Sequence, residues 1–219
     1  MIVEEERLRA ELVRACGDAE LDPGAVVVWV VDAVRPPGAT PIAYLQPAGE
    51  VRADTVLVFR AVGAGRAEAH RLAAHRLALW RSLPGLPDAA LGPMLRHELE
   101  HARRWERSGV AFYEADERLR ALAGPDDYAR LPTEREANAA AGAYARRALA
   151  PAELDALRRV PELAGLLAAE PPADVVAETA ALLRARLGED GAAPAPAALA
   201  PPRRAEPLVE VVHPVEAPA

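Results

Sequence analysis

The chain contains 219 residues, of which 51% are hydrophobic, so it is long and apolar enough for one domain with a buried core. Its formal net charge of −7 argues against a large basic surface and therefore against direct binding of nucleic acid. A single cysteine, Cys16, excludes an internal disulfide framework. The acidic start is unlike a signal peptide, and the apolar run at 25–31 is too short to span a membrane, so we expect a cytoplasmic protein.

The first half of the chain predicts helices on either side of a group of strands. An amphipathic pattern predicts a helix over residues 3–16. Apolar and β-branched runs predict strands at 25–34, 41–46 and 51–60, which we expect to form a small antiparallel sheet. Leucines and alanines at helical spacing then predict a helix over 65–83. Its two histidines, His70 and His75, point about 140° apart on such a helix, so we do not expect them to share a metal ion.

The second half predicts helices followed by a tail. Helices are expected around residues 95–106, 110–124 and 133–149, with two or three short ones over 151–187. Residues 188–219 are rich in proline and alanine, which is typical of a disordered tail, so 1–187 is expected to form a single α+β domain. The apolar segment LVEVV within this tail has a second interpretation, as a strand that adds to the sheet edge that would receive a substrate.

The segment LRHELEHARRWE at 95–106 carries the candidate chemistry. His97 and His101 are four residues apart, which places them about 40° apart on one helix face, where two imidazoles can share one ion. Glu98 lies between the histidines and the expected buried face, as a general base at a cleft requires. Glu100 falls among the arginines of the opposite arc, which we expect to face solvent.

A third ligand is expected from the helix at 133–149. Glu134 and Glu136 are the candidates, and Glu136 is assigned to a capping box with Thr133 at the start of that helix. Glu134 is left as the ligand. Asn138 follows it by four residues on the same face and is expected to accept the N–H of a metal-bound imidazole. Two histidines and one carboxylate form the ligand set of a catalytic zinc site, and a nearby carboxylate is its general base.

These two motifs resemble those of the gluzincin metallopeptidases. HELEH is followed, 33 residues after its last histidine, by EREAN. The sequence EREANAAA is most similar to that of the small ImmA/IrrE-like group. The resemblance covers roughly residues 65–149. It implies a zincin-like α+β fold, in which a small antiparallel sheet packs on a helical part, and it implies His97, His101 and Glu134 as Zn²⁺ ligands. It also implies Glu98 as the base and Asn138 as a residue that supports the metal ligands without binding the ion.

The function that follows from this interpretation is zinc-dependent hydrolysis of peptide bonds in a peptide or protein substrate. Tyr128 is the first candidate for stabilising negative charge on the substrate, with Tyr113 and Tyr144 as others. An alternative is a regulatory zinc-binding protein with narrow or no peptidase activity, because ImmA/IrrE-like proteins often act with transcriptional regulators. A metal-free helical interaction module is a third interpretation.

Overall fold

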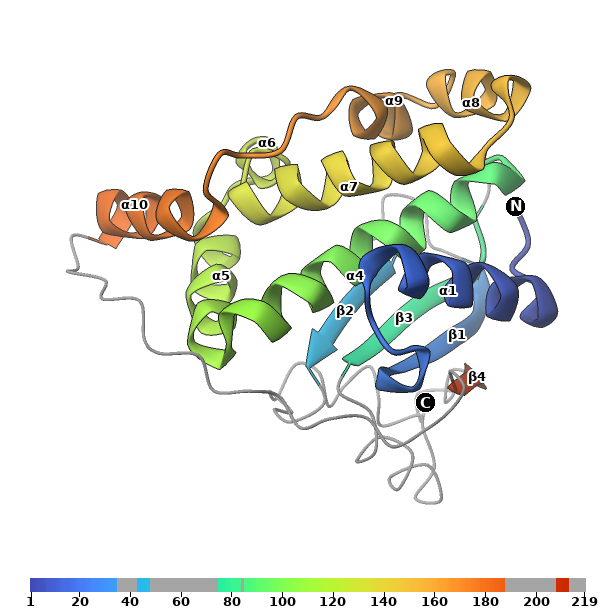
Figure 1. Cartoon of the computed structure of the whole chain (residues 1–219), viewed down its shortest axis with the longest axis horizontal. Helices are drawn as coiled ribbons and strands as arrows, with labels where there is room; N and C mark the ends of the chain where they lie inside the picture. The colour runs from blue at the N-terminus through green and yellow to red at the C-terminus, as the bar shows by residue number, and fades with distance from the viewer. Residues whose placement is uncertain (35–42, 48–74, 84, 188–207, 213–219) are drawn as a thin grey trace, which may run out of the picture.

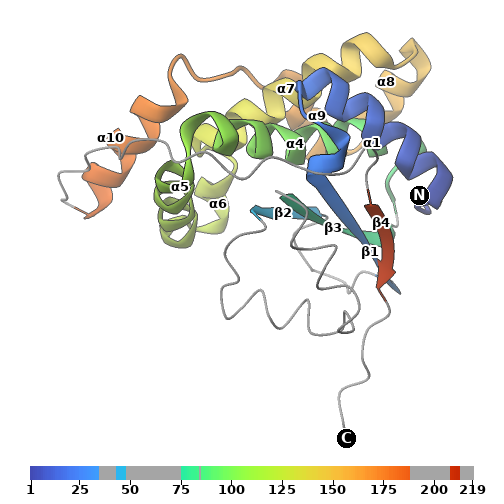
Figure 2. The same cartoon turned by 60° about the horizontal axis from the view of Figure 1, so that its bottom comes forward.

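A computed structural model describes residues 1–34, 43–47, 75–83, 85–187 and 208–212 of the protein (Figure 1). A four-stranded sheet forms one layer, and helices cover one face of it (Figure 2). The strands are β1 (Val26–Val34), β2 (Ala43–Pro47), β3 (His75–Ser82) and β4 (Leu208–Val212). The helices are α1 (Glu5–Ala19), α4 (Leu91–Ser108), α5 (Val110–Leu122), α6 (Pro125–Tyr128), α7 (Pro132–Ala148), α8 (Pro151–Arg158), α9 (Pro161–Ala168) and α10 (Val175–Leu187), with the short 3₁₀ turns η1 (Pro23–Ala25) and η3 (Asp88–Ala90).

The predicted antiparallel sheet is wrong. The strand order is β2-β3-β1-β4, in which β1 pairs in parallel with both β3 and β4, and the β2–β3 pair is antiparallel. The prediction assumed that strands joined by turn-forming residues are neighbours, but β3 lies between β1 and β2. Parallel neighbours are joined by crossover connections, and local residues do not encode that pairing. The described chain is mainly helical with a small mixed sheet.

The strand β3 occupies residues 75–82, where a helix was predicted. Leu77 and Leu79 are fully buried and alternate along the strand, which is the period of two expected for a strand. The helix prediction relied on the longer spacing between leucines and overlooked this alternation. Residues 65–74, which include His70, and the strand predicted at 51–60 lie outside the described residues.

The helix α4 is the centre of the helical layer and packs against α1, α5, α7 and β2. Leu95, Leu99 and Ala102 are buried, as the helical pattern predicts. The helix ends at Gly109, whose φ of 80° lies in a region that glycine adopts readily. The helices predicted at 3–16, 110–124 and 133–149 and over 151–187 are confirmed as α1, α5, α7 and α8 to α10.

Arg96 and Glu100 of the arginine-rich arc of α4 are buried, which corrects the prediction that the arc faces solvent; Arg107 is exposed. Glu100 is 1% exposed and accepts hydrogen bonds of 2.9 Å from Arg103. Arg96 lies 2.7 Å from Glu100 and donates a 2.7 Å hydrogen bond to Asp18 of α1. A helical wheel shows which residues share an arc. It does not show that α1 supplies Asp18, the partner that allows Arg96 to be buried.

The start of α7 differs from the predicted capping box. The helix begins at Pro132, and Thr133 lies within its first turn, where it donates a 2.7 Å hydrogen bond to Asp116 of α5. Glu136 accepts a 2.8 Å hydrogen bond from Arg104 of α4. Both side chains therefore join α7 to neighbouring helices, and proline provides the helix start instead.

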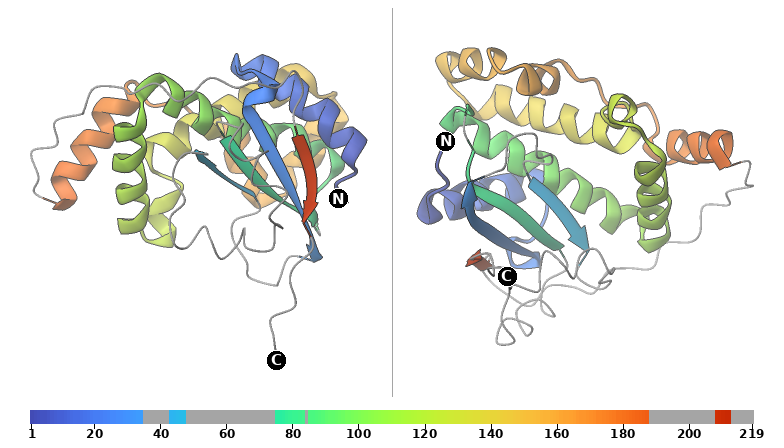
Figure 3. Two further views of the ribbon diagram at one scale, coloured as in Figure 1. Left: turned by 90° about the horizontal axis from the view of Figure 1, so that it is seen from below. Right: turned by 180° about the vertical axis from the view of Figure 1, so that it is seen from behind.

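The LVEVV segment of the predicted tail forms β4, which pairs with β1 over residues 208–212. Figure 3 shows β4 at the sheet edge opposite β2. Because β2 is the strand that packs against α4, the segment does not cover the edge nearest the HELEH helix. The rest of 188–219 lies outside the described residues, and the expected domain boundary stays a prediction.

Close packing of α7 against α9 provides a test of the helical layer. A Cβ atom added at Gly142 would lie 2.6 Å from the backbone oxygen of Leu166. We expect Gly142→Ala to lower the free energy of unfolding by about 1–3 kcal/mol, because backbone atoms must move apart. A Cβ at Gly165 in α9 meets nothing within 4 Å, so Gly165→Ala should be neutral or stabilising. Urea unfolding of both variants checks this, and equal stability of the two would contradict the packing.

Candidate metal centre

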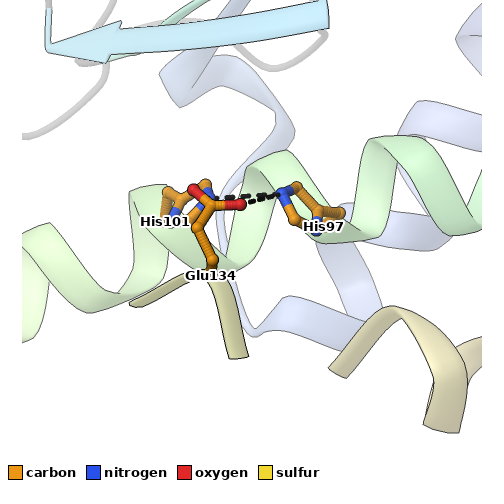
Figure 4. A group of neighbouring side chains, drawn as sticks. All are labelled: His97, His101 and Glu134. Atoms are coloured by element: carbon orange, nitrogen blue, oxygen red, sulfur yellow. Dashed lines mark hydrogen bonds and ion pairs between the residues drawn. The ribbon is translucent and has the colours of Figure 1, made fainter. Parts of the chain in front are cut away.

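Two helices bring the predicted ligands together. His97 and His101 project from α4, and Glu134 projects from the first turn of α7, so that its carboxylate lies beside both imidazoles (Figure 4). His101 and Glu134 are buried, and His97 is half-buried. The group therefore sits between two packed helices, and the residues that the sequence predicted as ligands meet at one point.

The distances within this group fit a tetrahedral ion. The two Nε2 atoms of His97 and His101 lie 3.3 Å apart. Glu134 places Oε2 3.3 Å from Nε2 of His97 and Oε1 3.3 Å from Nε2 of His101. Ligand atoms that are about 2.0–2.1 Å from a tetrahedral zinc ion are separated from one another by about 3.3–3.4 Å. Each oxygen of Glu134 has this separation from one histidine, so the three side chains of the His-His-Glu group lie close enough together to hold a metal ion.

The charges in the group favour a cation. Burial lowers the pKa of His97, but its hydrogen bond to Glu134 and the negative charges of Glu134 and Glu98 outweigh burial and raise the pKa overall. Burial raises the pKa of Glu134, but the charges of His101 and Arg120 and the hydrogen bonds from both histidines bring it well below its ordinary value. Glu134 is therefore an anion, which is the form that binds a cation.

Arg120 of α5 is a part of the group that the sequence analysis missed. Its Nη1 lies 2.6 Å from Oε1 of Glu134, and its Nε donates a 2.9 Å hydrogen bond to Asp116. Its Nη2 lies 3.3 Å from Nδ1 of His101. The signal available in the sequence was the spacing of Asp116 and Arg120, which are four residues apart on a predicted helix. Nothing in that spacing indicates that the pair faces Glu134.

Glu98 lies beside the same group. It is half-buried, and its negative charge raises the pKa of both His97 and Tyr128, which places its carboxylate within electrostatic reach of both. In the described part of the chain it is not among the residues that converge as ligands. The role of Glu98 as a general base stays a prediction.

Tyr128 is at the edge of the group. Its hydroxyl contacts Nη1 of Arg120, and the Arg120 guanidinium lies 5.4 Å from the centre of its ring. Burial raises the pKa of Tyr128; Arg120 lowers it, and Glu134 and Glu98 raise it, so the pKa is raised overall. The phenol therefore keeps its proton. As Tyr128 is an exposed residue, a substrate can reach it.

The other predicted residues stand apart from the group. Asn138 is half-buried on α7, and the structure records no hydrogen bond between it and either histidine among the described residues. Tyr144 is directed to α1, where its hydroxyl donates a 3.4 Å hydrogen bond to Glu11. The side chain of Tyr113 and that of His75 lie outside the described residues. Trp105 stacks on His101 with ring centres 5.9 Å apart, which helps to fix that imidazole.

Comparison of the chain with protein-family models, with curated proteins and with solved structures finds no match. The resemblance to gluzincins therefore depends on the two sequence motifs alone. In the described part of the chain, no helix has both the length and the apolar character needed to cross a membrane. What the geometry itself supports is a buried group of two histidines and one glutamate that can hold a metal ion.

Proposed function

We propose that the protein is a zinc-dependent metallopeptidase, in which His97, His101 and Glu134 hold the ion and Glu98 is the general base. The observation that carries the proposal is the convergence of two imidazoles and one carboxylate: the Nε2 atoms lie 3.3 Å apart, and each oxygen of Glu134 lies 3.3 Å from one of them. Glu98 belongs to the same helix as both histidines. The gluzincin-like motifs support the same assignment. The substrate would be a peptide or a protein segment that reaches the group in an extended conformation.

The position of Glu98 favours hydrolysis over another use of the same ligands. Two histidines and one carboxylate also hold iron in oxygenases. Such a site needs no carboxylate poised beside its ligands, whereas hydrolysis needs a base that takes a proton from water. Glu98 precedes Leu99 and His101 on the same helix as both histidines, so its distance from them is fixed by the helix backbone.

Each residue then has a distinct task. A bound zinc ion would supply Lewis-acid polarisation of the scissile carbonyl and acidification of water. Glu98 accepts the proton of the attacking water and passes it to the leaving amine nitrogen. His97 and His101 from α4 and Glu134 from α7 would hold the ion.

Tyr128 is the donor for the charge that develops on the carbonyl oxygen of the substrate. An arginine only donates hydrogen bonds, so the contact between Arg120 and the Tyr128 hydroxyl uses a lone pair of the phenol oxygen. The O–H hydrogen of Tyr128 is left to donate to a substrate. This donor needs no rearrangement during the reaction, which is the property that makes such groups effective.

The metal ligands give the first test. Purified protein should carry about one zinc per chain, and His97→Ala, His101→Ala and Glu134→Ala should each lose it, because two remaining ligands hold the ion poorly. Elemental analysis of the purified proteins measures this. Glu136→Ala and Glu100→Ala are the controls, and both should keep the metal, although loss of Glu100 should lower the free energy of unfolding by about 3 kcal/mol. Iron in place of zinc, or zinc retained in Glu134→Ala, would count against the proposal.

The base gives the second test. Glu98→Gln keeps the shape of the side chain but cannot accept the proton, so it should keep zinc and lower kcat by about 10²–10⁴-fold. The activity is measured by mass spectrometry on a library of unstructured peptides and unfolded proteins. Equal cleavage by the two proteins would discard Glu98 as the base. A zinc-loaded wild-type protein that cleaves none of the library would favour a regulatory protein, such as a partner of a transcriptional regulator.

The oxyanion donor gives the third test. Tyr128→Phe removes the O–H group and should lower kcat by about 10²-fold with little change in KM, since the hydrogen bond strengthens as charge develops on the substrate. Tyr144→Phe is the matched control, because Tyr144 contacts Glu11 and should be dispensable for the reaction. Steady-state kinetics on a peptide cleaved by the wild type compares them. The same kcat in both variants would remove Tyr128 from the reaction.

A further inference from the structure

We propose that Arg120 is a positioning residue, which holds one oxygen of Glu134 so that the other oxygen is presented to the metal. The inference depends on the metal centre proposed above. It adds a residue that neither motif contains, and it assigns the way in which the carboxylate ligand binds. Arg120 belongs to α5, so a third helix takes part in a centre whose ligands come from α4 and α7.

The guanidinium is held in one orientation by residues that are not ligands. Its Nε donates to Oδ2 of Asp116 at 2.9 Å, and its Nη2 donates to Oγ1 of Thr133 at 3.3 Å. Thr133 in turn donates to Oδ1 of Asp116 at 2.7 Å, so both oxygens of a fully buried carboxylate are used. This closed arrangement fixes the direction in which Nη1 reaches Glu134, since a planar guanidinium held at two nitrogens cannot rotate.

The contact with Glu134 distinguishes its two oxygens. Each oxygen lies 3.3 Å from the Nε2 atom of one histidine, Oε1 from that of His101 and Oε2 from that of His97, but Nη1 of Arg120 lies 2.6 Å from Oε1. An oxygen that is already paired with a guanidinium charge is the weaker metal ligand of the two. Glu134 is therefore expected to bind through Oε2 alone. Binding through one oxygen keeps a coordination position open, which a catalytic zinc requires.

Charge balance permits a cation so close to a metal site. A lone guanidinium next to the ligands would repel a divalent ion, but Asp116 is 2.9 Å from Arg120 and offsets its charge. Glu134 thus remains available as an anionic ligand. The contact of Nη2 with Nδ1 of His101 is not required, because an imidazole bound to metal through Nε2 carries its proton on Nδ1. Thr133 remains as the acceptor for Nη2.

The test compares metal binding by Arg120→Lys and wild type. A lysine ammonium is a point charge that cannot bridge Asp116 and Glu134, so zinc affinity measured by chelator competition should fall by about 10–100-fold. Cobalt(II) in place of zinc reports coordination number, because four-coordinate cobalt absorbs visible light more strongly than five-coordinate cobalt. The Arg120→Lys protein should absorb more weakly per cobalt, as both oxygens of Glu134 become ligands. A merely structural role would not change this spectrum.

Two further variants complete the experiment. Arg118→Lys, on an exposed position of the same helix, is the control and should leave both measurements unchanged. Thr133→Val removes one anchor of Arg120 at constant volume, and it should shift the cobalt spectrum in the same direction if Arg120→Lys does not fold. Wild-type affinity and spectrum in a folded Arg120→Lys or Thr133→Val protein would overturn the inference alone. A wild-type protein that binds neither zinc nor cobalt would overturn the proposed function and the inference together.

Discussion

Burial of most of α4 among its neighbours is the constraint on which the structure depends. The helix is covered by α1, α5, α7 and β2, yet half of its circumference is made of arginines and glutamates and the other half carries two histidines. Each buried polar group needs a partner, because an unpaired buried charge costs several kcal/mol. Glu100 pairs within α4, with Arg96 and Arg103, and other groups pair with neighbouring helices. Asp18 of α1 supplies one partner, and Glu134 and Glu136 of α7 supply the others. The His-His-Glu group is thus one of several polar contacts between α4 and its neighbours.

The two glutamates of α7 connect those contacts. Glu134 and Glu136 are two residues apart, which turns them about 160° from each other around the helix. One therefore faces the histidines while the other reaches Arg104, and Arg135 between them pairs with Glu178 of α10 at 3.0 Å. A rotation of α7 that broke the Arg104 contact would also move Glu134 away from the histidines. The Arg104–Glu136 ion pair and the contacts of Glu134 with the histidines therefore fit the same orientation of α7.

The sequence predicted what depends on local helix geometry. His97, His101 and Glu98 share one turn of one helix, so their mutual arrangement follows from the rise and rotation per residue. The motif-based choice of Glu134 named a residue that the structure does bring to them. The sequence did not predict the contact of Arg120 with Glu134, the burial of Arg96 and Glu100, or the parallel pairing of β1. Each of these depends on which distant segment becomes a neighbour. The misassigned capping role of Glu136 has the same cause, as only tertiary packing offers it Arg104 as a partner.

The balance of charge around the group gives an argument for a divalent cation that is independent of the motifs. Glu134, Asp116 and Glu98 contribute three carboxylates, and Arg120 contributes one guanidinium, so two negative charges are left over. Without an ion, the group can reduce this excess by binding a proton at His97, whose pKa is raised for that reason. An ion of charge two removes the excess and leaves both histidines neutral, as ligands must be.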